Sequence, residues 1–247
     1  MNKIFYIANW KMNKTVSECE DFFERFLSSY HRSQNEEIVF CPSFISLSKL
    51  DNMKISSKFD NISFGAQNVS HKKTGSYTGE VSVDMLKDTC SAFCIVGHSE
   101  RRSIYKESDD MINNKIKLLV SSNIRPILCI GETWEERQNG ISKKIISDQL
   151  SSCLGGVEKS KIIIAYEPIW AIGTSHNASE KDISDMNIVI KKEMNKLGYI
   201  DEQFYILYGG SVNINNLSII DKASFLNGFL IGGASLEPES FWGIIKK

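Results

Sequence analysis

A glutamate that directly follows an apolar run is the first place where this chain could do chemistry. Residues 162–165 read Ile-Ile-Ile-Ala, and Glu167 stands between Tyr166 and Pro168. Such a run is typical of a parallel strand covered on both faces, and proline ends a strand because it has no N–H to donate. We therefore expect Glu167 at the carboxyl end of a strand, where α/β proteins bind their ligands. A carboxylate there is either a general base or one partner of a structural salt bridge.

Lys11 and His98 follow other apolar runs in the same way. Lys11 comes shortly after residues 4–8, and His98 follows residues 92–96 closely. Each has an ordinary interpretation, because most lysines lie on the surface and a histidine in an apolar setting is often a satisfied core residue. These two side chains form a site with Glu167 only if the fold brings the three strand ends together.

Glycine-rich turns follow the last two apolar runs. Residues 209–211 read Gly-Gly-Ser after the run 204–208, and residues 232–235 read Gly-Gly-Ala-Ser after the run 228–231. In such turns backbone N–H groups and a helix amino end can hold a phosphate. Either turn alone is weak support, because barrels need tight turns anyway. Both together, after a seventh and an eighth strand, are where barrel phosphate sites are commonly found.

Short apolar runs alternate with amphipathic stretches along the whole chain. The expected strands are 4–8, 38–41, 62–65, 92–96, 127–130, 161–166, 204–208 and 228–231. The clearest helical stretches are 18–29, 109–121, 143–154, 181–197, 213–220 and 238–245. Eight strands with crossovers between them fit a closed parallel barrel better than an open sheet. Because no linker or repeat divides the 247 residues, we predict one α/β domain, a (β/α)8 barrel over residues 1–247.

Composition narrows the possible functions. The chain is 42% hydrophobic and 24% charged with a net charge of -1, so it has no electrostatic footprint for nucleic acid or an anionic membrane. No apolar run approaches the roughly 18 residues of a membrane span. The six cysteines include no C-x-x-C pair, and the four histidines have no metal-ligand spacing. We therefore expect a cytoplasmic enzyme with reduced thiols and no bound metal.

Eight motifs in order make the chain similar to the triosephosphate isomerase family over essentially its whole length. The matching segments are 9–13, 65–68, 77–80, 96–102, 129–132, 165–174, 208–212 and 228–236. The resemblance implies a TIM barrel that interconverts dihydroxyacetone phosphate and D-glyceraldehyde 3-phosphate through an enediol(ate), in glycolysis and gluconeogenesis. It also implies that the enzyme needs no cofactor.

The resemblance assigns the catalytic roles. Glu167 is the base, His98 the electrophile and Lys11 the cation that holds the substrate, while Asn9 is a neighbouring polar contact. Glu100 is implied to be a buried acid beside Asn9 and Lys11. One carboxylate can serve both proton transfers, because the enediol presents its two carbons to one face. The oxyanion needs preorganised donors, and this family is itself a known example of a neutral histidine electrophile held at a helix amino end.

The resemblance also implies a lid over residues 168–178 that excludes water and suppresses phosphate loss from the intermediate. Trp170 gives the lid apolar cover. The residues implied for the lid, its latch and the phosphate cradle are Pro168, Trp170, Gly173, Ala178, Tyr208, Ser211, Gly232 and Gly233.

A long polar excursion at about 67–80 has no helical period, which is unusual in a compact domain unless the segment is functional. By resemblance it docks into a second copy to form a homodimer. Thr78 then reaches the region of the partner's site, and Glu80 pairs with Arg101 across the interface.

Two other functions fit these residues less well. An aldolase with a lysine Schiff base needs a lysine on a central strand, whereas Lys11 lies past the end of the first strand beside a base and a histidine. A scaffold that only binds phosphate would gain by losing Glu167, because a carboxylate near an anionic ligand costs about 4 kcal/mol at an effective dielectric of about 20. An assay for glyceraldehyde 3-phosphate separates the three.

The chain departs from the family pattern at three places. The lid ends Ser175-His176-Asn177 where Gly-Lys-Thr is usual. Tyr205 stands where an arginine is common, and Asn227 where an aspartate is. These changes put local salt bridges of the family in doubt and leave the catalytic residues in place.

Overall fold

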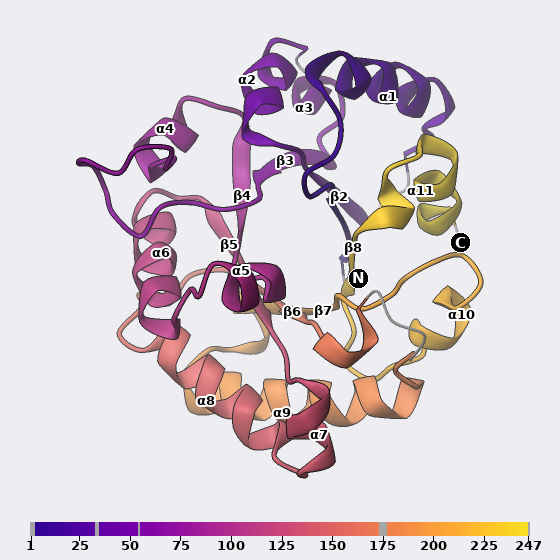
Figure 1. Cartoon of the computed structure of the whole chain (residues 1–247). Helices are drawn as coiled ribbons and strands as arrows, with labels where there is room; N and C mark the ends of the chain where they lie inside the picture. Colours follow the sequence, from indigo (N-terminus) through magenta and orange to yellow (C-terminus); the bar gives the residue numbers. More distant parts are fainter. Residues whose placement is uncertain (1–2, 33–34, 54, 173–176, 247) are drawn as a thin grey trace.

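The structure, a computed structural model, describes residues 3–32, 35–53, 55–172 and 177–246. Within this part of the chain, parallel strands in sequence order from β1 to β8 close into a barrel, with β8 paired back to β1 (Figure 1). The strands are β1 (Ile4–Asn9), β2 (Glu36–Cys41), β3 (Ile62–Ala66), β4 (Ser91–Val96), β5 (Arg125–Ile130), β6 (Ile162–Tyr166), β7 (Phe204–Tyr208) and β8 (Gly228–Ile231). The predicted barrel is confirmed, with strand bounds within two residues of those expected.

Helices surround this barrel (Figure 1). They are α1 (Val16–Ser29), α2 (Phe44–Asn52), α3 (Ile55–Lys58), α4 (Val83–Lys87), α5 (Ser99–Ile104), α6 (Asp109–Ser121), α7 (Trp134–Gln138), α8 (Ser142–Leu154), α9 (Glu180–Lys196), α10 (Leu217–Ile220) and α11 (Pro238–Ile245), with 3-10 turns η1 (Ile169–Ala171), η2 (Asp201–Gln203) and η3 (Gly233–Ser235). Sequence chemistry sets their starts. At α1, for example, Thr15 and Glu18 form a reciprocal capping box that satisfies two free backbone N–H groups.

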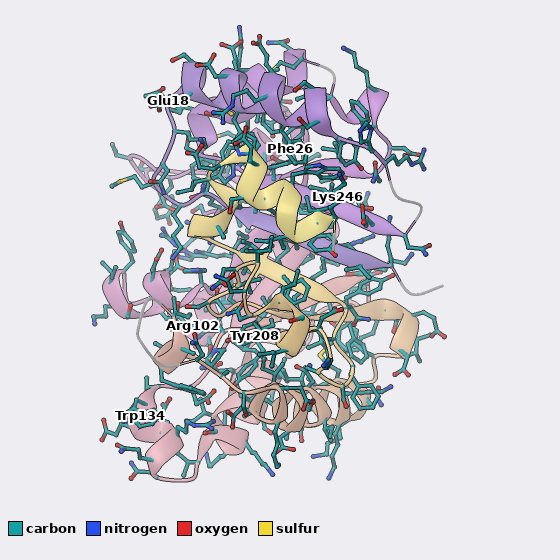
Figure 2. The ribbon with its side chains drawn as sticks, turned by 90° about the vertical axis from the view of Figure 1, so that its right-hand side faces the viewer. Glu18, Phe26, Arg102, Trp134, Tyr208 and Lys246 are labelled. Atoms are coloured by element: carbon teal, nitrogen blue, oxygen red, sulfur yellow. The ribbon has the colours of Figure 1, made fainter. Side chains whose placement is uncertain are left out.

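Side chains of the strands pack into two separate apolar layers. One fills the barrel interior and includes Ile7, Ile163 and Ala165. The other lies between the strands and the helices. There Phe26 of α1 packs 6.0 Å from Phe241 of α11, ring centre to ring centre, and Figure 2 shows it between these two helices. The alternation of strand side chains therefore decides which residues can face the barrel mouth.

Closure of the barrel depends on one glycine. Gly228 begins β8 with φ +140, and a β-carbon there would lie 2.0 Å from the carbonyl oxygen of Phe5 on β1. Since only glycine tolerates both the backbone angle and this approach, Gly228 allows the last strand to pair with the first.

The helix expected at 213–220 is wrong in its first half, because α10 begins only at Leu217. Asparagine side chains compete with the helix there. The Asn213 carboxamide oxygen accepts from the backbone N–H of Asn215 at 2.9 Å, and the Asn216 carboxamide donates to the Ser211 carbonyl at 2.8 Å. Such local side-chain bonds stabilise a non-helical turn at 213–216 and so delay the start of the helix.

The segment 67–80 runs between β3 and α4 and projects beyond the ring of helices (Figure 1). Residues 72–80 are exposed and carry no helix or strand. Among the described helices none is long and apolar enough to cross a bilayer.

Candidate functional site

The inward faces of the strands lead directly to the polar residues at the carboxyl mouth. Ile163 and Ala165 of β6 point into the barrel, so Glu167, two residues further on, continues the same face. Ile7 of β1 is followed in the same way by Asn9. The topology thus places Glu167 and Asn9 at one end of the barrel, as the sequence predicts.

Glu167 is nearly inaccessible, with 2% of its surface exposed. One carboxylate oxygen lies 3.1 Å from His98 Nε2, and the other accepts from the backbone N–H of Ser99 at 3.2 Å. A β-carbon at Gly131 would lie 1.8 Å from the Glu167 carbonyl oxygen, so this glycine lets the β5 and β6 ends approach. Glu167 and His98 therefore meet, although 69 positions separate them in sequence (167 − 98).

His98 caps the helix α5, and the helix amino end by itself favours the neutral form of the imidazole. Its Nδ1 accepts from the backbone N–H of Glu100 at 3.3 Å, which leaves Nε2 to carry the proton and donate to Glu167. Burial by itself lowers the pKa of His98, but the nearby carboxylates, Glu167 above all, outweigh it and the net pKa is raised. If Glu167 moves away onto a substrate, its contribution is lost, and burial and the helix amino end both favour a neutral imidazole.

Lys11 reaches the same mouth from an unusual backbone. Its φ is +52, a left-handed conformation that costs an ordinary residue about 1–2 kcal/mol. Its ammonium group lies 2.6 Å from a carboxylate oxygen of Glu100, and its backbone N–H donates to the Asn9 carboxamide at 3.2 Å. Lys11, Asn9 and Glu100 are neighbours, as expected.

Glu100 was expected to be a buried acid, and in the single chain this is wrong: its side chain is 45% exposed. It lies on α5 with one side toward Lys11 and the other toward solvent. Thr78 and Glu80, expected near it only across an interface, lie on the exposed segment 72–80. Arg101 donates to Glu107 of its own chain at 2.5 Å.

A cavity of about 360 Å³ opens between these groups. It is lined by Asn9, Lys11, His98, Glu167, Ile172, Gly209, Gly210, Ser211, Val212, Asn213, Leu230, Gly232, Gly233 and Ala234. Both glycine-rich turns therefore reach the cavity that holds the carboxylate. A β-carbon at Gly233 would meet nothing within 4 Å, and as the first residue of η3 it has an N–H without an intrahelical acceptor. The cavity offers an anion cradle facing an acid–base pair.

The sequence did not single out Ile172 or Leu230 as cavity residues. Ile172 and Leu230 bring apolar surface beside the carboxylate. Leu230 could have been found from the alternation of β8, which turns it inward. Ile172 gave no such signal, because its place depends on contacts between distant segments.

A buried acid holds the start of the segment 168–178, which is expected to form a lid. Glu132 is fully buried and accepts from the Trp170 indole at 2.9 Å and from the Tyr166 hydroxyl at 3.1 Å. Arg137 lies 4.2 Å from the centre of the Trp170 ring and pairs with Asp182 at 2.5 Å, beyond the end of the lid. Arg137 therefore contacts Trp170 near the start of the segment 168–178 and Asp182 just past its end.

Of the remaining lid and latch residues, the Ser211 hydroxyl donates to the Ala171 carbonyl at 3.0 Å, and Ala178 is buried. Tyr208, the last residue of β7, lies well inside the molecule, whereas Trp134 lies at its edge (Figure 2). Gly173, Ser175 and His176 lie outside the described residues.

Gly209 gives a first prediction. A β-carbon there would lie 2.8 Å from Glu167 Cγ, so Gly209→Ala should displace the carboxylate and lower kcat about tenfold. Gly155→Ala is the matched control, because its new β-carbon meets only a helix carbonyl at 3.2 Å, remote from the cavity. Steady-state kinetics with a thermal melt checks both variants. A Gly209→Ala enzyme with unchanged kcat would show that the carboxylate does not need this space.

Comparisons with known proteins give a consistent result. A family described as triosephosphate isomerase matches residues 4–247. The triosephosphate isomerase of Dictyoglomus thermophilum is 42% identical over 251 aligned positions, covering 100% of both chains. That of Aquifex aeolicus is 44% identical over 241 positions, covering 96% of each.

Proposed function

This chain belongs to the triosephosphate isomerase family, and from that premise we propose that Glu167, His98 and Lys11 carry out the reaction in the cavity described above. The reaction is the interconversion of dihydroxyacetone phosphate and D-glyceraldehyde 3-phosphate, a step of glycolysis. The observation that supports these roles best is the contact of 3.1 Å between the Glu167 carboxylate and His98 Nε2 inside the cavity.

The proposed step begins with Glu167 ionised. It takes a proton from C1 of dihydroxyacetone phosphate, the C–H electron pair forms a C1–C2 double bond, and the C2 carbonyl oxygen becomes the enediolate oxygen. The protonated Glu167 then returns a proton to C2, while the hydroxyl proton of O1 moves to O2 and C1 becomes the aldehyde carbon. Because the same carboxylate removes the proton from C1 and returns a proton to C2, no second base is required.

Glu167 must turn to do this. Its carboxylate is bonded to Ser99 and His98, and the substrate carbons have to replace these partners. The inward space beside Gly209 and the apolar walls of Ile172 and Leu230 allow a carboxylate to lie against carbon with little water. Exclusion of water strengthens a carboxylate as a base.

His98 and Lys11 would stabilise the enediolate. Neutral His98 donates from Nε2, and the Lys11 ammonium supplies a full positive charge from the same cavity lining. The substrate phosphate would lie on the N–H groups of Ser211, Gly232 and Gly233, joined by Gly173 when the lid 168–178 closes. Ser211 and Tyr208 would latch the closed lid, and the proposal includes a cytoplasmic location, in keeping with a glycolytic role. An assay of the purified chain with dihydroxyacetone phosphate, coupled to detection of glyceraldehyde 3-phosphate, tests the reaction itself.

A homodimer is part of the proposal. Residues 72–80 of the segment 67–80 are exposed to solvent, Met12 beside Lys11 is 98% exposed, and the acid Glu100 is open on one side. A second copy docked there would cover apolar surface next to the site, with Thr78 near the partner's site and Glu80 facing Arg101 of the partner.

We accordingly expect light scattering to give twice 27.9 kDa. Thr78→Arg adds a bulky charge to the docking segment and should raise the dimer dissociation constant at least tenfold. Asn139→Arg, on the exposed end of α7, adds the same side chain elsewhere and should leave it unchanged. A fully active monomer at micromolar concentration would contradict the proposal.

A further inference from the structure

One carboxamide joins the ends of three neighbouring strands beside the cavity. Gln67 is the first residue after β3, and its Nε2 donates to the Lys11 carbonyl at 2.8 Å and to the Cys41 carbonyl at 2.9 Å. Cys41 ends β2, and its carbonyl also accepts from the backbone N–H of Trp10 at 3.2 Å. Both partners of Nε2 are carbonyl oxygens, which only accept, so both amide hydrogens are used and the orientation of the amide is fixed.

These bonds hold Lys11 in its left-handed conformation. The peptide unit before Lys11 is fixed by its N–H, which donates to Asn9, and by the Trp10 carbonyl, which accepts from the Asn13 carboxamide at 2.7 Å. Gln67 holds the peptide unit after Lys11 through its carbonyl. Fixing both peptide planes fixes φ and ψ of Lys11, and a residue with φ +52 needs such support to stay there.

Gln67 is itself held firmly. Its neighbour Asn68 accepts from the buried ammonium of Lys115 at 2.7 Å, and Lys115 in turn contacts the buried Glu107. The backbone at Gln67 is therefore held by β3 on one side and, through Asn68, by a buried ion pair on the other. The same residue begins the segment 67–80, so the docking segment and Lys11 share one anchor.

We propose that Gln67 is a positioning residue for Lys11: through the Lys11 carbonyl it sets the backbone conformation that aims the Lys11 ammonium into the cavity. It touches no reacting atom and acts only through Lys11. This proposal rests on the role of Lys11 proposed above. A cation aimed wrongly holds the anionic substrate and the enediolate less well, so its loss should raise KM and lower kcat together.

A double-mutant cycle tests it. Gln67→Met keeps the length of the side chain and removes both donors, and we expect kcat/KM to fall about tenfold with a higher KM. Lys11→Met should lower kcat/KM at least about 100-fold. In the Lys11→Met background, Gln67→Met should change kcat/KM less than about twofold, because there is no cation left to aim. Gln203→Met is the control, since it removes one exposed side-chain bond, to the Ile200 N–H, at the opposite end of the barrel before β7.

The outcomes separate the two claims. If Lys11→Met keeps the original kcat/KM, the role proposed for Lys11 is wrong. If Lys11→Met is severely impaired and Gln67→Met lowers kcat/KM by the same factor in both backgrounds, or lowers kcat with KM unchanged, Gln67 has only a structural role and the inference is wrong. Should Gln67→Met give no cooperative melt, Gln67→Asn, which keeps the amide on a shorter stem, is judged by the same cycle.

Discussion

Replacing Glu167 with glutamine should lower kcat by at least about 10³-fold while the fold is retained. Glutamine has nearly the shape of glutamate and can still accept from the Ser99 N–H, so the packing at this buried position should survive. It cannot take a proton from carbon. Steady-state kinetics, with circular dichroism and a thermal melt, measures both effects.

Glu37 provides the matched control for that variant. It is also a buried strand glutamate, bonded to Lys3 and to the Ser63 hydroxyl, but it lies near the amino end of β2. Glu37→Gln should cost stability and leave kcat within about twofold, because the opposite end of the barrel does not touch substrate. A Glu167→Gln enzyme that keeps more than about a tenth of the original kcat would exclude Glu167 as the base.

Replacing His98 with glutamine should lower kcat about 10²- to 10³-fold, the usual cost of losing one donor to a developing oxyanion. Glutamine can offer an N–H but lacks the cap that His98 makes to the Glu100 N–H, so the donor is no longer held in place. The same variant releases Glu167 from its resting contact with the ring.

The control for this variant is His31→Gln. His31 is exposed and lies between α1 and β2, so this change should leave kcat unchanged. If His98→Gln loses activity only through KM, His98 binds substrate without stabilising the enediolate, and its assignment as electrophile is wrong.

Much of this barrel could be predicted from the sequence because its signals are local. Apolar runs such as 162–165 mark buried parallel strands, and Pro168 marks where β6 must end. Because strand side chains alternate between two faces, Glu167 can be placed at the barrel mouth from its own strand alone. The amphipathic stretch 109–121 predicted α6 with its observed bounds. Its apolar residues recur with the helical period over the whole stretch, so the signal for a helix is strong.

Other features depend on contacts between distant segments and left no local mark. The Ser99 N–H on Glu167 and the Gln67 amide on Lys11 join strands that are far apart in sequence. The exposure of the Glu100 side chain depends on whether another protein surface packs against it, and the sequence has no local signal for such a contact. The late start of α10 arises because two asparagines bond the backbone locally, a competition that the hydrophobic period of 213–220 does not register.

Deuterium incorporation from solvent tests the central claim, that the carboxylate at position 167 transfers the proton between C1 and C2. The enzyme is supplied with dihydroxyacetone phosphate in D2O, and proton NMR follows the label at C2 of the product and at C1 of the remaining substrate. The account predicts label at both carbons with the original enzyme, because protonated Glu167 exchanges with solvent, and a rate at least about 10³-fold lower with Glu167→Gln. Incorporation by Glu167→Gln at the original rate would mean that another group is the base, and the account would be wrong.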